Sequence, residues 1–132
     1  RYQTGDIATI AEAEQCNPCC FPALESVEGR IQDYVITRDM ERIPIAPALF
    51  DYNFDWTGID RFQVLQEQLG ELEFKLVILP EFETKQNELL QNVSKAFGKI
   101  LGNDFVIRAV RVEDIPLTPR GKYRYFEQKV VL

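Results

Sequence analysis

The C-terminal part of the chain carries a short basic motif that could contact an anionic group. Residues 115–124 include Pro116, Pro119 and a Gly121-Lys122 pair that lies between two arginines. The prolines disfavour a helix or a central strand, so we expect an extended, exposed loop. Gly121 permits a tight turn, and the flexible ammonium group of Lys122 suits a mobile contact to a carboxylate or a phosphate. Lys122 is therefore a candidate for contact with an anionic group.

Lys122 also has a simpler interpretation as a solvated lysine, which an isolated Gly-Lys pair favours. A phosphate-binding P-loop does not fit, because Pro116 stands where that motif needs glycine and Tyr123 follows the lysine. The chemical interpretation of Lys122 therefore depends on other motifs in the chain.

Two motifs near the N-terminus could serve the same chemistry. A Thr-Gly-Asp motif ends at Asp6, and residues 29–33 read Gly-Arg-Ile-Gln-Asp. Asp6 could simply close a turn, and Arg30 could be an ordinary surface arginine. A carboxylate can also accept two hydrogen bonds at once. Each motif is weak alone, and the order of all three along the chain carries the signal.

Three cysteines occur in one short stretch, at Cys16, Cys19 and Cys20, and the chain has no histidine. The spacing suits half of a zinc site, but a closed site usually needs four ligands, so the fourth would have to be Glu14 or come from elsewhere. Free thiols are the favoured interpretation, and we expect no metal here. The absence of histidine excludes a self-contained Ser-His-Asp or Cys-His site. An odd cysteine count does not fit a secreted disulfide framework, so we expect a cytoplasmic protein.

The composition is that of an acidic globular domain. The chain has 132 residues, 45% of them hydrophobic, which is enough to form one hydrophobic core. Its formal net charge is −6. The negative charge argues against nucleic acid or an anionic membrane surface as a partner. No apolar run approaches the roughly 20 residues of a membrane span. Because the chain begins with Arg1, we expect a fragment of a longer protein.

The pattern of residues predicts an α+β fold. Residues 71–79 alternate between apolar and polar positions, as in a half-buried strand, and residues 84–101 carry one apolar helical stripe with Thr84 as N-cap and Gly102 as C-cap. A small N-terminal hairpin with a strand at residues 7–10 and a Cys/Pro loop should come first. From residue 34 the elements read β-α-β-β-α-β, the ferredoxin-like split βαβ pattern with a mixed sheet and two helices. The expected ranges are strand 34–36, helix 47–54, strands 59–68 and 71–79, helix 84–101 and strand 105–112.

Taken together, the motifs at Asp6, residues 29–33 and Lys122 resemble the adenylate-forming ligases, in which they occur in this order. Residues 29–37 and 61–66 are similar to the phenylacetate–CoA ligase, deazaflavin-coenzyme adenylyl synthetase and capsule-biosynthesis (CapK-type) branch. The resemblance covers nearly the whole chain. It implies that residues 1–29 are the tail of a missing large domain and that residues 30–132 are the C-terminal lid domain.

The resemblance also implies roles for individual residues. Lys122 would contact the carboxylate substrate and the α-phosphate, Asp6 the ribose hydroxyls, and Arg30 the nucleotide near the ribose and phosphate. Gln32 would be the hinge, where the superfamily usually has Asp or Lys. The intact enzyme would use ATP and Mg²⁺ and could use CoA as acceptor. A glycine that is common after the hinge is absent from residues 38–41, which puts transfer to CoA in more doubt than adenylation.

The expected partners of the chain are its own missing N-terminal adenylation domain and a carboxylic acid. The isolated domain should be inactive, because it lacks most of the ATP and acid pocket. An exposed sheet edge could also mediate a homodimer. The alternative is a ferredoxin-like regulatory or protein-interaction module without catalysis, which explains the fold but not the three ordered motifs.

Overall fold

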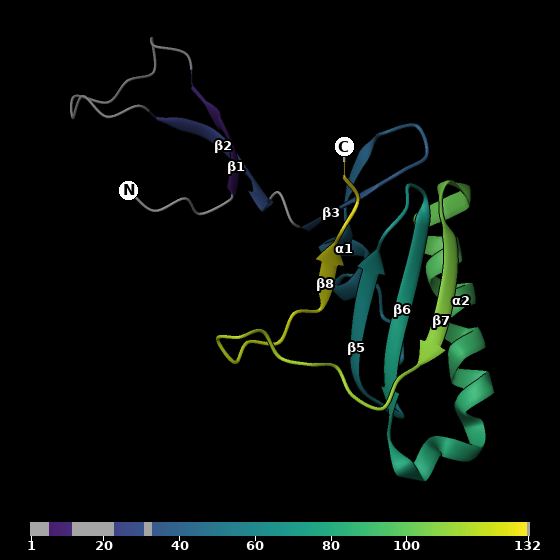
Figure 1. Cartoon of the computed structure of the whole chain (residues 1–132). Helices are drawn as coiled ribbons and strands as arrows, with labels where there is room; N and C mark the ends of the chain where they lie inside the picture. The colour runs from purple at the N-terminus through teal and green to yellow at the C-terminus, as the bar shows by residue number, and fades with distance from the viewer. Residues whose placement is uncertain (1–5, 12–22, 31–32, 132) are drawn as a thin grey trace. The chain divides into compact units, whose positions relative to one another are not determined.

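The computed structural model describes residues 6–11, 23–30 and 33–131 (Figure 1). The chain divides into two compact units, Arg1–Asp33 and Tyr34–Leu132, called here the hairpin unit and the sheet unit. None of the helices in the described ranges is long and apolar enough to cross a membrane.

The hairpin unit contains two antiparallel strands, β1 (Asp6–Ile10) and β2 (Leu24–Arg30). The predicted N-terminal hairpin is therefore confirmed, while its Cys/Pro loop lies outside the described residues. Large apolar side chains are exposed on the hairpin: Ile10, Leu24 and Val27. A two-stranded hairpin without a covering layer is only marginally stable in water.

The sheet unit is built around a four-stranded mixed sheet with the strand order β7-β6-β5-β8. Strands β5 and β6 are antiparallel, whereas β6 pairs with β7 and β5 pairs with β8 in parallel. A separate hairpin of β3 and β4 and the short helix α1 precede the sheet. The bounds are β3 Tyr34–Ile36, β4 Arg42–Pro44, α1 Ile45–Phe50, β5 Ile59–Gln66, β6 Glu71–Ile78, α2 Gln86–Leu101, β7 Val106–Arg111 and β8 Phe126–Gln128.

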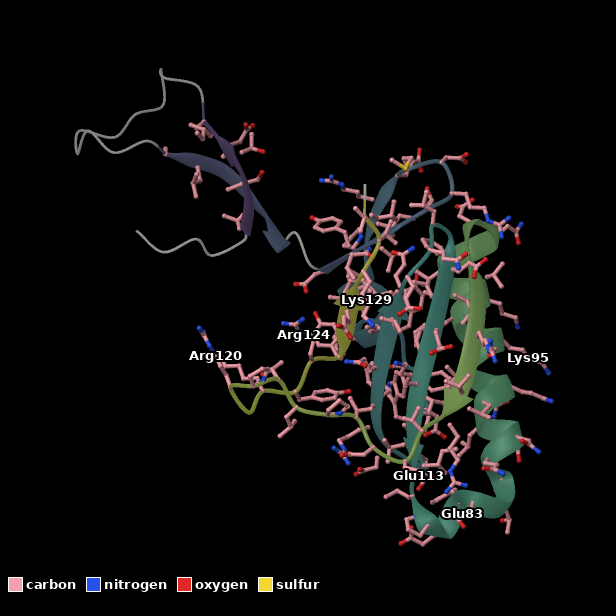
Figure 2. The ribbon with its side chains drawn as sticks, viewed as in Figure 1. Glu83, Lys95, Glu113, Arg120, Arg124 and Lys129 are labelled. Atoms are coloured by element: carbon pink, nitrogen blue, oxygen red, sulfur yellow. The ribbon has the colours of Figure 1, made fainter. Side chains whose placement is uncertain are left out.

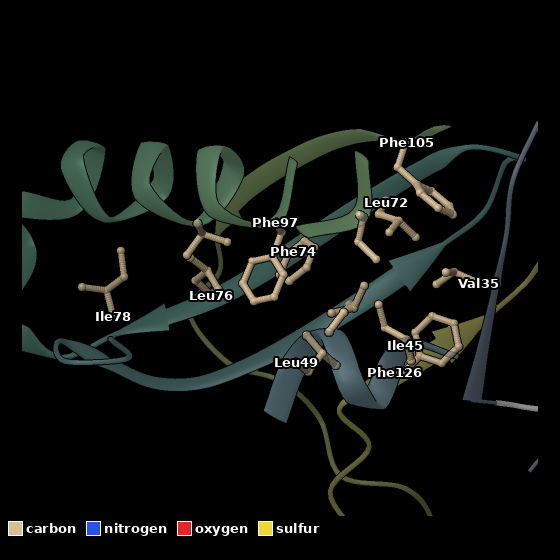
Figure 3. Close-up of a cluster of buried hydrophobic side chains, with 14 residues drawn as sticks. Val35, Ile45, Leu49, Leu72, Phe74, Leu76, Ile78, Phe97, Phe105 and Phe126 are labelled. Carbon is tan, nitrogen blue, oxygen red and sulfur yellow. The ribbon is translucent and has the colours of Figure 1, made fainter. Parts of the chain in front are cut away.

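Helix α2 covers one face of this sheet, and the core lies between them, with further buried residues from α1 and β3 (Figure 3). The alternation predicted for β6 is confirmed, because Leu72, Phe74, Leu76 and Ile78 are all buried. The apolar stripe of α2 supplies Val93, Phe97 and Leu101 to the same core. The rings of Phe74 and Phe97 stack with their centroids 4.6 Å apart, and burying each ring contributes on the order of 2 kcal/mol.

The predicted α+β class is confirmed, with two helices and a mixed sheet, but three details differ. Strand β3 pairs with β4 rather than with the main sheet, and β8 takes the edge position beside β5. Helix α1 spans Ile45–Phe50 instead of residues 47–54. Thr84 does not cap α2, because a 3₁₀ helix at Pro80–Lys85 runs directly into it. Pro80 suits the first position of that helix, where its missing N–H is not needed.

Candidate functional site

Lys122 lies in a tight turn whose backbone is closed by hydrogen bonds. The amide of Gly121 donates to the carbonyl of Thr118 over 2.8 Å, and the amide of Thr118 donates to the carbonyl of Lys122 over 2.8 Å. The amide of Lys122 donates to Oγ1 of Thr118 over 3.0 Å. Gly121 adopts a φ of +72°, a conformation that favours glycine. The turn therefore has a defined shape, as the Pro-Gly chemistry of the sequence predicted.

The side chain of Lys122 is exposed, and no ion pair of its ammonium group is found within the described ranges. In Figure 2 the neighbouring Arg120 lies at the tip of the loop and Arg124 lies close to the sheet. The turn thus presents a lysine to solvent on a loop that connects the two edges of the sheet.

The residues after Lys122 are bound one by one to β5. The hydroxyl of Tyr123 accepts a hydrogen bond from the amide of Phe62 over 3.2 Å. Nε2 of Gln63 donates to the carbonyl of Arg124 over 3.0 Å, and the amide of Val64 donates to the carbonyl of Tyr125 over 2.8 Å. These contacts lead directly into β8, where Phe126 is buried. The C-terminal stem of the loop is therefore a continuation of the sheet.

Tyr123 has a perturbed pKa because this stem residue lies against β5. Partial burial raises the pKa of the Tyr123 phenol above its ordinary value of 10.0. The hydrogen bond from the Phe62 amide and the charge of Arg61 lower the pKa of the phenol and offset part of this effect. The neutral phenol is thus the form that this environment favours.

The N-terminal stem of the loop is anchored by Ile115, which is only 1% exposed. Just before it, Asp114 forms an ion pair with Arg61 at the start of β5, with Nη2 and Oδ1 2.8 Å apart. Arg61 is partly exposed and Asp114 largely so, and this pair therefore adds little stability. The ten-residue stretch 116–125 therefore projects between two buried anchors, Ile115 and Phe126.

An open groove of about 390 Å³ lies between this loop and the face of the sheet that α2 does not cover. Its lining mixes two cations, Lys75 and Arg124, with two carboxylates, Asp114 and Glu127. Such mixed charge does not favour one class of charged ligand.

Asp6 and Arg30, the predicted nucleotide contacts, lie in the hairpin unit. The register of β1 and β2 pairs Asp6 directly with Arg30, so the two positions meet at the same end of the hairpin. The sequence did not predict this pairing, because 24 positions separate the two residues along the chain.

The remaining predicted residues, Gln32 of the hinge and Cys16, Cys19 and Cys20 of the zinc half-site, fall outside the described residues. Within the described ranges, no group of three or more His, Cys, Asp or Glu side chains could hold a metal ion. The boundary between the two units follows Asp33, one position after Gln32.

The sequence analysis missed two residues that tie the loop stem to the rest of the sheet unit, Gln66 and Gln128. Gln66 is completely buried, and Nε2 of Gln128 donates to its Oε1 over 2.7 Å. The signal was a glutamine directly after the apolar pair Val64-Leu65 at the end of β5, because a buried amide needs hydrogen-bond partners.

Comparison with known protein families identifies the family of this chain. The model of the CapK C-terminal domain family matches residues 40–129, more than half of the chain. The chain belongs to this family. The match includes Lys122 and its turn, and Asp6 and Arg30 lie outside it. No curated protein sequence matches the chain.

Two solved structures share the fold. One is 2-hydroxyisobutyryl-CoA ligase in its postadenylation state, with a TM-score of 0.54, 21% identity and 94% of this chain covered. The other comes from work on fatty acyl-adenylate ligases from E. coli and L. pneumophila, with a TM-score of 0.53, 18% identity and 92% covered. The chain spans 27% of the length of the first and 20% of the second.

Proposed function

We propose that the chain is the C-terminal part of an ATP-dependent adenylate-forming ligase and that Lys122 acts in its active site. The observation that most supports this is the closed turn that presents Lys122, which lies inside the residues matched by the CapK C-terminal domain family. The likeness in fold to a CoA ligase in its postadenylation state and to fatty acyl-adenylate ligases agrees with it.

In this reaction a carboxylate oxygen of the substrate attacks the α-phosphorus of ATP, forming an acyl-adenylate and releasing pyrophosphate. Negative charge accumulates around phosphorus, and a positioned ammonium group stabilises it. Lys122 would supply that charge. Asp6 and Arg30 would bind the nucleotide. The carboxylate of Asp6 can accept hydrogen bonds from the ribose hydroxyls, and the guanidinium group of Arg30 can bind phosphate.

We further propose that residues 1–29 complete a large N-terminal domain of the same protein. The hairpin supports this, because Ile10, Leu24 and Val27 are exposed on a two-stranded element that needs a covering layer. That domain would hold most of the ATP and acid pocket and, with the ATP phosphates, Mg²⁺. The acyl group would then pass to CoA or another acceptor, in the cytoplasm.

Lys122→Ala in the full-length enzyme tests the catalytic role. We expect acid-dependent pyrophosphate release to fall on the order of 10²-fold, the cost of removing one charge-stabilising donor. Folding should be unaffected, because the side chain is exposed. Lys99→Ala, which removes another exposed lysine, from α2, serves as the control for net charge. A wild-type rate in Lys122→Ala would show that this lysine does not act in adenylation.

The proposed hinge has its own test. Proline at position 32 fixes φ there and restricts rotation between Arg30 and β3. If separate orientations serve adenylation and transfer, Gln32→Pro should preserve adenylate formation and strongly slow acyl transfer. Single-turnover assays of the two half-reactions in the full-length enzyme would measure this, and equal effects on both would exclude Gln32 as the pivot.

A further inference from the structure

The outer edge of β3 is paired with a side chain instead of a strand. Oε1 of Gln66 accepts a hydrogen bond from the amide of Ile36 over 2.8 Å, and Nε2 of Gln66 donates to the carbonyl of Ile36 over 2.7 Å. The amide of Gly70 donates to the same carbonyl over 3.0 Å. The carboxamide of Gln66 thus binds the backbone N–H and C=O of Ile36 as a neighbouring strand would.

Gln66 uses its full hydrogen-bonding capacity at this position. Besides the two bonds to Ile36, its Nε2 donates to the carbonyl of Gln68 over 3.1 Å. Its Oε1 also accepts from Nε2 of Gln128 over 2.7 Å. A carboxamide offers two donors and two acceptor sites, and all four are used. Because Gln66 has no exposed surface, losing any of these bonds would leave a buried polar group unpaired.

Gln128 extends the same network along β3. Its Nε2 donates to the carbonyl of Tyr34 over 3.1 Å, and its Oε1 accepts from the amide of Val130 over 3.0 Å. Gln66 ends β5, and Gln128 ends β8. The two amides, called here the amide clasp, therefore join β3, β5 and β8 at one point.

The amide clasp joins the strand that follows the proposed hinge in the chain to the strand that follows the proposed catalytic turn. Strand β3 begins two positions after Gln32, and β8 begins four positions after Lys122. The stem of the turn is bound to β5 through Tyr123, Arg124 and Tyr125. An apolar side chain at position 66 could bury similar surface, but it would not fix the register of β3. Directed, fully satisfied hydrogen bonds do so.

We propose that Gln66, supported by Gln128, is a positioning residue that makes β3 and the Lys122 turn move as one body. This inference rests on the proposed functions of Lys122 and Gln32. When the domain rotates at the hinge, the Lys122 turn then rotates with β3, because the amide clasp keeps β3 from shifting against β5 and β8. Gln66 touches neither substrate nor nucleotide in this account, and it acts only through the placement of Lys122.

Hydrogen exchange tests the structural half of the inference in the full-length enzyme. In Gln66→Met, amide exchange in residues 34–37 should accelerate about tenfold or more, because β3 loses its outer hydrogen bonds. Gln91→Met replaces an exposed glutamine of α2 and is the matched control. Unchanged exchange in Gln66→Met would overturn the clasp.

A double-mutant cycle tests the catalytic half. Gln66→Met should lower kcat for acid-dependent pyrophosphate release about tenfold with KM for ATP changed less than twofold, and it should cause no further loss in a Lys122→Ala background. Additive losses would mean a general structural role and would overturn the inference. If Gln66→Met does not fold, Gln128→Met, which removes a half-buried partner, is judged by the same criteria. A wild-type rate in Lys122→Ala alone contradicts the proposed function, whereas a slow Lys122→Ala with a wild-type Gln66→Met contradicts only this inference.

Discussion

Replacing Gly70 with alanine should destabilise the sheet unit far more than the small change in volume suggests. Gly70 forms the turn between β5 and β6 with a φ of +69°. Its amide donates to the carbonyl of Ile36, and its carbonyl accepts from the amide of Val106 over 2.8 Å. Gly70 therefore connects β3, the hairpin of β5 and β6, and β7, and any shift of its backbone disturbs all three.

The expected cost has two parts. An L-residue at this φ is strained by about 1 kcal/mol. The added Cβ would also overlap Cγ of Arg38 and lie 3.0 Å from the carbonyl oxygen of Asp104. The exposed Arg38 side chain can move aside, but the Asp104 carbonyl belongs to the backbone that enters β7, and displacing it costs about 1–2 kcal/mol more. We therefore expect the free energy of unfolding to fall by about 2–3 kcal/mol.

Urea unfolding followed by tryptophan fluorescence is the assay. Trp56 is the only tryptophan in the chain, and it stacks on Phe62 with ring centroids 4.3 Å apart, so it reports on the sheet unit. Gly121→Ala is the matched control, with a φ of +72° and no atom within 4 Å of the added Cβ. It should lose about 1 kcal/mol at most. Equal losses in the two variants would refute the steric part of the argument.

Two further predictions concern the helix and the loop stem. Gly98→Ala should raise the free energy of unfolding by about 0.5–1 kcal/mol, because alanine is the better helix former and no atom lies within 4 Å of the added Cβ; a lower urea midpoint would contradict this. Because the pKa of Tyr123 is raised in the folded chain, its contribution is fully present below pH 10 and is lost as the pH rises above that value. Wild type should therefore lose stability above pH 10 more steeply than Tyr123→Phe, and parallel pH–stability curves would show that the phenol is not responsible.

The parts of the fold that follow local periodicity were predictable from the sequence. The alternation of β6 and the apolar stripe of α2 each identify a buried face without knowledge of any partner. The pairing of β3 and the existence of β8 were not predictable in this way. Each of these strands has only three residues, too few for a period, and their partners are set by tertiary contacts.

In the candidate site too, local features were predictable from the sequence and long-range contacts were not. The turn at Lys122 follows from the local chemistry of Pro119 and Gly121, and the structure has such a turn. The attachment of its stem to β5 depends on a register between residues about sixty positions apart, which no local pattern encodes. The pairing of Asp6 with Arg30 likewise depends on the hairpin register. The roles of these residues stay predictions until the variants are assayed.

Because β8 is a short edge strand, it can open separately from the unfolding of the whole sheet unit. Strands β5, β6 and β7 pack with α2, whereas β8 has only three residues, one of them the buried Phe126, and pairs with β5 at the edge across a long chain separation. Closing such a separation is entropically costly, and short edge elements open at lower free energy than the core. A subglobal opening that releases β8 would withdraw Phe126 from the core and release the stem of the Lys122 turn without requiring α2 to unfold. We therefore expect the lifetime of a positioned Lys122 to depend on the opening of one edge strand as well as on the global stability of the domain.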